Sequence, residues 1–292
     1  MAISNLQKQK IQELKKQYDS LKEGKESLLK MIDEVEIPET VFNSNAIENS
    51  TLTLRETEQI LMEMELSRNV SLREVFEAKN LARVIEFVWS KFKTADLSIE
   101  LILLFHQMLI GNIDDVIAGR FRQKGEFVRI GTHIAPAPEH AERMIEEILI
   151  EYENDFQGYF LDKIAHFHLN FEMIHPFNDG NGRMGRVLIN YQLLRLGFPS
   201  IIIRDKEKQE YYRSLREYDL SQKIGNMGNI LVMSLLESLH KRIAYLKSLK
   251  VIKLVDYAVQ IGESSQTVLN KAKRQTIPAF REKGIWKIGV EY

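Results

Sequence analysis

The sequence contains no cysteine among its 292 residues. Disulfide bonds, thiolate metal sites and cysteine nucleophiles are therefore excluded, and any catalytic group must be of another residue type. Its longest apolar runs, such as residues 101–105, fall far short of the roughly 18 residues that a membrane span needs, and the N-terminus lacks the apolar stretch of a signal peptide. We therefore expect a cytoplasmic protein without a membrane partner.

Net charge is almost absent as well, at −1 for the whole chain, so the average gives no argument for binding to nucleic acid or to membranes. The average conceals an asymmetry. Residues 241–292 contain eleven lysines and arginines against four acidic residues, which leaves the first 240 residues at about −8. A hydrophobic content of 44% excludes a disordered chain. The sequence therefore predicts an acidic folded body with a basic C-terminal module.

Helical periodicity dominates the body and strand signals are few, so we expect an all-α fold. Apolar residues from Ile11 to Ile32 alternate in spacings of three and four, which predicts one long amphipathic helix over residues 4–33. This helix either packs on the body or forms a coiled coil, and the second alternative leaves a homo-oligomer open. Further helices are expected after the capping boxes at Thr53 and Ser71 and near residues 98–110, 138–154, 160–174, 183–196, 207–220 and 227–248.

Two segments depart from this helical pattern. Residues 127–138 place β-branched residues on both sides of a Gly131-Thr132 turn, followed by prolines, which predicts a short β-hairpin that covers the helical body as a flap. The C-terminal segment has the order helix, turn, helix and a hairpin centred on Gly284, which resembles a winged helix-turn-helix. We therefore divide the chain into an N-terminal helical region (1–95), a core (96–248) and a winged-helix-like module (249–292).

The module either binds DNA through residues 252–292 or packs as a docking unit for another protein. Its second helix carries Lys271, Lys273 and Arg274, which would meet phosphates, while Gln266 and Asn270 are candidate base-reading residues.

The segment HPFNDGNGRMGR, residues 175–186, concentrates the polar chemistry of the body. Its glycines match the spacing of a dinucleotide-binding fingerprint, with Asp205 about 20 residues later, but no β-rich run precedes them. A metal cluster of His166, His168, His175 and Asp179 is also disfavoured, because residues 166 and 168 lie about 200° apart on a helix.

A phosphate site accounts for nearly every polar residue of this segment. Successive backbone N–H groups of a glycine turn can converge on an anion where the next helix begins. Arg183 and Arg186 lie three residues apart on that helix, so both can reach one polyphosphate. Asp179 can hold Mg²⁺, and His175 is a candidate general base.

Residues 175–186 match, position by position, the signature H-P-F-x-[D/E]-G-N-G-R-x-x-R of the Fic family, and the resemblance extends over about residues 35–245. It implies that AMP is transferred from ATP to a Ser, Thr or Tyr hydroxyl of a target protein. The resemblance assigns the base to His175, Mg²⁺ to Asp179 and the phosphates to five residues: Gly180, Asn181, Gly182, Arg183 and Arg186. A phosphotransferase branch of the family has lysine at the position of Gly182, so the glycine favours nucleotidyl transfer.

Three further segments are similar to family features. Ser44 to Asn49 resembles the inhibitory motif [S/T]-x-x-x-E-[G/N], which implies that Glu48 pairs with Arg186 and that the enzyme inhibits itself. The flap resembles a target-docking strand made of Val128, Arg129, Ile130 and Gly131. Tyr212 is the expected adenine-lining aromatic residue. Three alternatives stay open: another nucleotide, removal of AMP, and a DNA-binding regulator in which the core is accessory.

Overall fold

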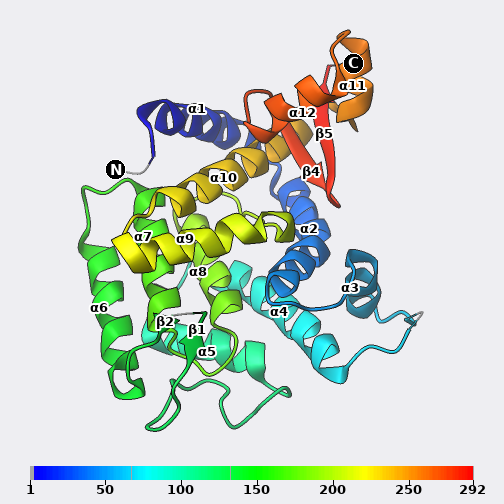
Figure 1. Ribbon diagram of the computed structural model, residues 1–292. Coiled ribbons are helices and arrows are strands. Elements are labelled where there is room, and N and C mark those ends of the chain that lie inside the picture. The colour runs from blue at the N-terminus through cyan, green and yellow to red at the C-terminus, as the bar shows by residue number, and fades with distance from the viewer. Residues whose placement is uncertain (1–2, 67, 132, 292) are drawn as a thin grey trace.

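The computed structural model describes residues 3–66, 68–131 and 133–291, and this part of the chain is mainly helical (Figure 1). The helices are α1 (Asn5–Lys22), α2 (Glu26–Ile47), α3 (Leu54–Leu61), α4 (Leu72–Lys91), α5 (Ile99–Ile110), α6 (Ala141–Asn154), α7 (Phe160–Ile174), α8 (Asn181–Arg195), α9 (Lys208–Ser221), α10 (Gly225–Leu246), α11 (Leu254–Gln260) and α12 (Ser265–Lys273). Short 3₁₀ helices are η1 (Pro138–His140) and η2 (Asp205–Glu207), and the strands are β1 (Arg129–Ile130), β2 (His133–Ile134), β3 (Lys250–Lys253), β4 (Ala279–Glu282) and β5 (Ile285–Val290). The all-α prediction for the body is confirmed.

The prediction of one helix over residues 4–33 is wrong. The chain breaks at Gly24, whose φ of +72° belongs to the left-handed region that glycine adopts without steric cost. The break separates α1, which packs along α10, from α2, which starts at Glu26 and runs on to Ile47. The apolar periodicity continues across the break, so spacing alone did not reveal it.

Two apolar clusters fill the body, and α7 and α8 contribute to both. One cluster includes Val41 of α2, Phe105 of α5 and Tyr191 of α8. The other includes Ile11 of α1 and Leu235 of α10, packed against residues of the same two central helices. A helix that is buried on nearly all sides has little freedom to shift. The loop between α7 and α8 is therefore held at both ends by the core.

The C-terminal module has a small apolar core of its own. Strand β5 pairs with β3 on one side and with β4 on the other, both antiparallel. Helices α11 and α12 cover this sheet, with Ala258, Val268 and Ile288 in the shared core. The two predicted helices and the hairpin are present, whereas strand β3 had not been predicted, because its residues carry a mixed pattern of lysines and β-branched side chains.

Strands β1 and β2 form the predicted flap as an antiparallel pair, although with only two residues in each strand. Arg129 lies opposite Ile134, and Ile130 lies opposite His133. Thr132, the second turn residue of the prediction, lies outside the described residues. Within the described ranges, no helix combines the length and the apolar character that crossing a bilayer requires.

Candidate active site

Helix α7 ends and helix α8 begins at residues of the predicted signature. His175 caps α7 with a left-handed backbone (φ +48°), and Gly180 precedes α8 with φ of +83°. The loop between them closes on itself, because the Asn181 side chain accepts the Phe177 N–H (3.0 Å) and donates to the Phe177 carbonyl (2.8 Å). Both ends of this amide are therefore used within the loop, and only the backbone of Asn181 can contribute to an anion site.

Phe177 anchors the loop in the core. Its ring is fully buried and stacks on the imidazole of His106, with centroids 3.7 Å apart and planes 6° apart. The Gly119 N–H donates to His106 Nδ1 (3.0 Å), so Nε2 carries the proton and donates to the Asp179 carbonyl (3.0 Å). Burial lowers the pKa of His106 to about 4, so this neutral form persists at physiological pH. His106 thus fixes the loop from the side of α5.

The imidazole of His175 is held in one tautomer by a backbone carbonyl. Its Nδ1 lies 3.3 Å from the Glu172 carbonyl, which can only accept, so the proton resides on Nδ1 and the Nε2 lone pair is available. Burial lowers the pKa of His175 to about 4. The side chain is therefore neutral and able to take up a proton at pH 7.

The N-terminus of α8 forms a cradle, which we define as the backbone of residues 180–183. The first N–H groups of a helix have no partner within the helix. At α8 the Gly180 N–H donates to Asp179 Oδ1 (2.6 Å), and no N-cap side chain bonds to the N–H groups that follow. An anion is stabilised at such a position by these donors and by the helix dipole. The carboxylate of Glu48 lies directly over the cradle, where a Cβ added to Gly182 would collide with Glu48 Oε1.

Arg186 joins the cradle to the C-terminal end of α2. Its Nε donates to Ser44 Oγ (2.9 Å), and its Nη2 donates to the Ser44 carbonyl (2.8 Å) and to Glu48 Oε1 (2.9 Å). The guanidinium is buried, with 6% of the side chain exposed. Burial opposes its charge, but Glu48 holds the pKa of Arg186 above its ordinary value. Nη1 of Arg186 is buried without a hydrogen-bond partner among the described residues. It lies close to Gly182, because a Cβ added to that glycine would be 3.2 Å from Nη1.

Arg183 and Arg186 point at different anions in this structure. Arg183 donates to Asp179 (3.0 Å) and lies 3.4 Å from Glu77 of α4. Asp179 is also paired with Arg73 of α4. Burial opposes ionisation of Asp179, but Arg183 and Arg73 hold the pKa of its carboxyl below the usual range.

The metal predicted at Asp179 can be tested against the available donors. Among the described residues, no group of three or more histidines and carboxylates is arranged to hold a metal ion, so a site built from the protein alone does not fit. A magnesium ion that also binds phosphates needs only one or two carboxylates. Asp179 fits that type of site, because its side chain is 31% exposed and ionised beside the cradle. Arg73 would have to leave one carboxylate oxygen for the ion.

The two tyrosines after the core have different surroundings. Tyr211 is fully buried, bonded to His168 (2.9 Å) and Glu172 (3.3 Å). Burial, with a contribution from Glu48, raises the pKa of Glu172 to about 7. Tyr212 is half-buried and donates to the carbonyl of Ile47 (3.0 Å). Tyr212 therefore adjoins the end of α2 that carries Glu48.

The flap leaves one strand edge unpaired and presents apolar groups to solvent. Phe127 is 66% exposed and Ile134 is 72% exposed. His133 ties the flap to the body through Asp219 (2.8 Å) and the Met173 carbonyl (3.1 Å). An edge strand of this kind can accept an extended peptide by β-addition.

Sequence reasoning missed Arg122 and His106. Buried Arg122 donates to the carbonyls of His175 (2.8 Å), Glu126 (3.0 Å), Pro136 (2.9 Å) and Ile174 (3.2 Å), so one guanidinium joins the flap to the end of α7. In the part of the chain that the structure describes, no carboxylate forms an ion pair with Arg122, so no charge pattern in the sequence indicates it. Arg73 and Glu77 were not predicted either, because they lie on α4, whose sequence is that of an ordinary amphipathic helix.

Comparison with known proteins shows what this chain is similar to. The sequence model of the Fic/DOC family matches residues 96–193. The chain is 32% identical over 191 residues to the protein adenylyltransferase Fic of Nematostella vectensis, an alignment that covers 61% of this chain and 42% of that protein. The chain spans less than half the length of the curated relatives it matches.

Solved structures share the architecture. A Fic domain containing signaling protein from Bacteroides thetaiotaomicron matches with a TM-score of 0.72 at 25% identity, over 82% of this chain and 98% of that chain. A Fic family protein from Desulfovibrio desulfuricans matches with a TM-score of 0.67 at 20% identity, over 100% of this chain and 98% of that chain. The second likeness shows the fold alone, and it includes the C-terminal module.

Replacement of Arg122 by alanine is expected to loosen both the flap and the loop between α7 and α8. Four carbonyls would lose a charged donor, which we expect to lower the free energy of unfolding by about 3 kcal/mol. Urea denaturation measures this loss, and hydrogen exchange should quicken in both residues 126–136 and 174–180. Arg143→Ala, which breaks an exposed pair with Glu147, is the control and should change stability by less than about 0.5 kcal/mol. Faster exchange in the flap alone would contradict the joint role.

Proposed function

We propose that the protein transfers AMP from ATP to a Ser, Thr or Tyr hydroxyl of a target protein, because the sequence model of the Fic/DOC family matches residues 96–193. One observation carries the proposal: residues 175–186 bring together the available Nε2 of His175, the anion cradle at the start of α8 and the Nη1 of Arg186, which has no hydrogen-bond partner among the described residues. The names of the relatives support adenylyl transfer as the reaction.

In the proposed reaction, the Nε2 of His175 takes the proton of the target hydroxyl. The hydroxyl oxygen forms a bond to the α-phosphorus, and the bond from that phosphorus to the oxygen bridging to the β-phosphate breaks. Pyrophosphate leaves with the electron pair. The protein contributes position and fixed donors, which stabilise charge without reorganisation during the reaction.

Phosphate binding would use the N–H groups of Gly180, Asn181 and Gly182 together with Arg183 and Arg186. Asp179 would hold Mg²⁺, which when bound offsets the phosphate charge. Tyr212 would line the adenine. Residues 128–131 of the flap would pair with an extended segment of the target, so that its hydroxyl is presented beside His175.

Self-inhibition by Ser44 and Glu48 is part of the proposal. The Glu48 carboxylate repels an incoming phosphate at the cradle and retains the donors of Arg186 for α2. Both effects oppose nucleotide binding. Three further points remain predictions from the sequence. They are a cytoplasmic location, a homo-oligomer and the domain boundaries at residues 95 and 248.

Glu48→Gly is expected to raise target modification or automodification by at least about tenfold, equivalent to roughly 1.4 kcal/mol of inhibition. Incubation with labelled nucleoside triphosphates and a cell lysate, followed by mass spectrometry, measures the rate and identifies nucleotide and target. Arg186→Ala and His175→Ala in the same background should each remove the gain, and His175→Ala should leave nucleotide binding intact. Glu48→Gln, which keeps the bulk, should activate partially. Transfer by the His175→Ala variant within about tenfold of its parent would exclude His175 as the base.

The pH dependence of transfer should reflect the low pKa of His175. A base with a pKa of about 4 is neutral above that pH, so kcat/KM of the Glu48→Gly variant should stay level from pH 7.5 down to 5.5 and fall only as the pH approaches 4. In the unsubstituted protein the charge of Glu48 raises the pKa of His175. Loss of that charge in the Glu48→Gly variant therefore acts to lower this pKa. Loss of half the activity near pH 6.5 would indicate an ordinary solvated histidine instead.

A second activity, DNA binding by the C-terminal module, is supported by its topology. The order α10, β3, α11, α12, β4 and β5 with sheet order β3-β5-β4 is that of a winged helix-turn-helix, in which α12 would enter the major groove. Gln266, Asn270 and Lys273 are exposed on α12, and Arg274, which caps the helix, is exposed as well.

Binding to duplex DNA is expected to weaken with added salt, as measured by fluorescence anisotropy. Lys273→Ala with Arg274→Ala should lower the slope of log affinity against log salt by about 2, because two phosphate contacts are lost. Lys271→Ala is the matched control, since Lys271 is already paired with Glu263 (2.6 Å). The absence of any salt-dependent binding would favour a docking role for the module.

A further inference from the structure

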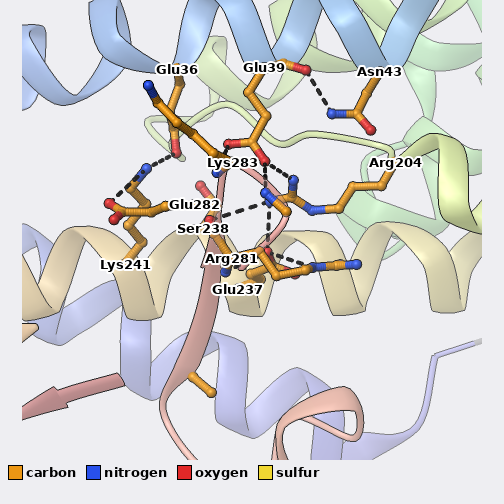
Figure 2. A network of polar contacts seen from close by, with 12 residues as sticks. Glu36, Glu39, Asn43, Arg204, Glu237, Ser238, Lys241, Arg281, Glu282 and Lys283 are labelled. Atoms are coloured by element: carbon orange, nitrogen blue, oxygen red, sulfur yellow. Dashed lines mark hydrogen bonds and ion pairs between the residues drawn. The ribbon is translucent and has the colours of Figure 1, made fainter. Parts of the chain in front are cut away.

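The turn of the C-terminal hairpin lies against α2, the helix that ends beside Glu48 (Figure 2). Glu39 of α2 accepts the backbone N–H groups of Lys283 (2.9 Å) and Gly284 (3.0 Å), one on each carboxylate oxygen. Lys283 and Gly284 both have left-handed backbones, with φ of +50° and +75°, as in the tight turns that join hairpin strands. The turn therefore presents two adjacent donors to a single carboxylate.

Buried charges extend this contact into the body. Glu39 is ion-paired with Arg204, which also binds Glu237 of α10 (2.8 Å). Glu237 in turn binds the guanidinium of Arg281 on β4 (2.6 Å). None of these four side chains is more than 12% exposed. A buried charge that loses its partner is strongly unfavourable, so the hairpin cannot leave α2 without disturbing this network.

A second connection fixes α2 one turn earlier. Glu36 binds Lys241 of α10 (2.9 Å), and Lys241 also binds Glu282 at the end of β4 (3.3 Å). Toward the active site, the Asn43 side chain donates to the Glu39 carbonyl (2.7 Å) and accepts the Asp205 N–H (3.0 Å). Asn43 directly precedes Ser44, which binds Arg186.

We propose that the β4–β5 turn is a latch that holds α2 in place over the cradle, so that the C-terminal module controls access of nucleotide to the active site. The proposal rests on the proposed function for its effect on activity. Glu48 caps α2 nine residue steps after Glu39, a distance of about 14 Å along the helix, so a displacement at Glu39 is transmitted to Glu48. A ligand of the module that draws the turn away from Glu39 would thereby release Ser44 and Glu48 from Arg186.

The latch can be reached from solvent. A cleft of about 860 Å³ adjoins the turn and is lined by α2, α10, α12 and the hairpin. Three lysines, Lys206, Lys273 and Lys283, are among its lining residues. Lys273 belongs to the exposed face of α12, so a ligand on that helix would also approach the latch.

Glu39→Gln tests the latch, because the amide keeps the size of the side chain but loses the charge that pairs with Arg204. Transfer should rise at least about fivefold over the unsubstituted protein, with no further gain when the same change is made in the Glu48→Gly background. Hydrogen exchange at the amides of residues 43–49 should also quicken, and this measurement needs no nucleotide. Glu39→Asp keeps the charge that pairs with Arg204, but its shorter side chain no longer reaches the N–H groups of the turn. Transfer and exchange should rise in this variant too, so the test does not depend on whether Glu39→Gln folds.

Glu58→Gln is the matched control. Glu58 lies on α3 and pairs with the side chain of Lys283 (2.8 Å), so its loss weakens a contact of the same turn without touching α2. It should change neither rate nor exchange. The latch is overturned if Glu48→Gly is active while the Glu39 variants match the unsubstituted protein, or if they add an equal gain in the Glu48→Gly background. If Glu48→Gly itself shows no transfer, the proposed function fails, whereas quickened exchange at residues 43–49 still supports the latch.

Discussion

The active-site half of this structure is organised around the buried guanidinium of Arg186, whose charge is offset by an anion. The side chain lies on a helix surrounded by core, where an unpaired charge is costly. In this structure Ser44 and Glu48 supply the compensating groups. The same position faces the backbone donors at the start of α8, which also favour an anion. Under the proposed function, a carboxylate of the chain and a phosphate of the substrate would compete for one set of donors, and both activity and inhibition would depend on Arg186.

The packing of α7 and α8 makes this competition well defined. Both helices contribute to two apolar clusters, so the loop between them cannot adapt to either occupant. His106 and Arg122 hold the loop by hydrogen bonds to its carbonyls, and neither depends on the nucleotide. The partner that would have to move is instead α2, which is held near Glu39 by buried charges and by the apolar residues Ile37 and Val41. The structure thus combines a rigid site with an adjustable competitor.

Much of this arrangement could be predicted from the sequence, for reasons that differ by element. Helix α7 coincides with its predicted range, because apolar periodicity and the following proline mark both ends. The signature loop was identified from residue types at fixed spacing, and the Ser44 to Asn49 segment from its resemblance. The break at Gly24 was missed because one glycine does not interrupt the apolar period. Sequence patterns did not indicate Arg122, Arg73 or the network around Glu39, because the contacts that matter join residues far apart in the sequence. No local pattern distinguishes an arginine that binds buried carbonyls from one in solvent.

The proposed self-inhibition uses a competitor that belongs to the same chain, which differs in one respect from a separate inhibitor. Glu48 is present beside Arg186 at a concentration set by the length and stiffness of the chain between them, and dilution of the protein does not change it. Synthesis of more copies would add catalyst and competitor in equal number. The fraction of molecules with an open cradle then depends on the supply of nucleotide and on whatever holds α2, and not on the abundance of the protein.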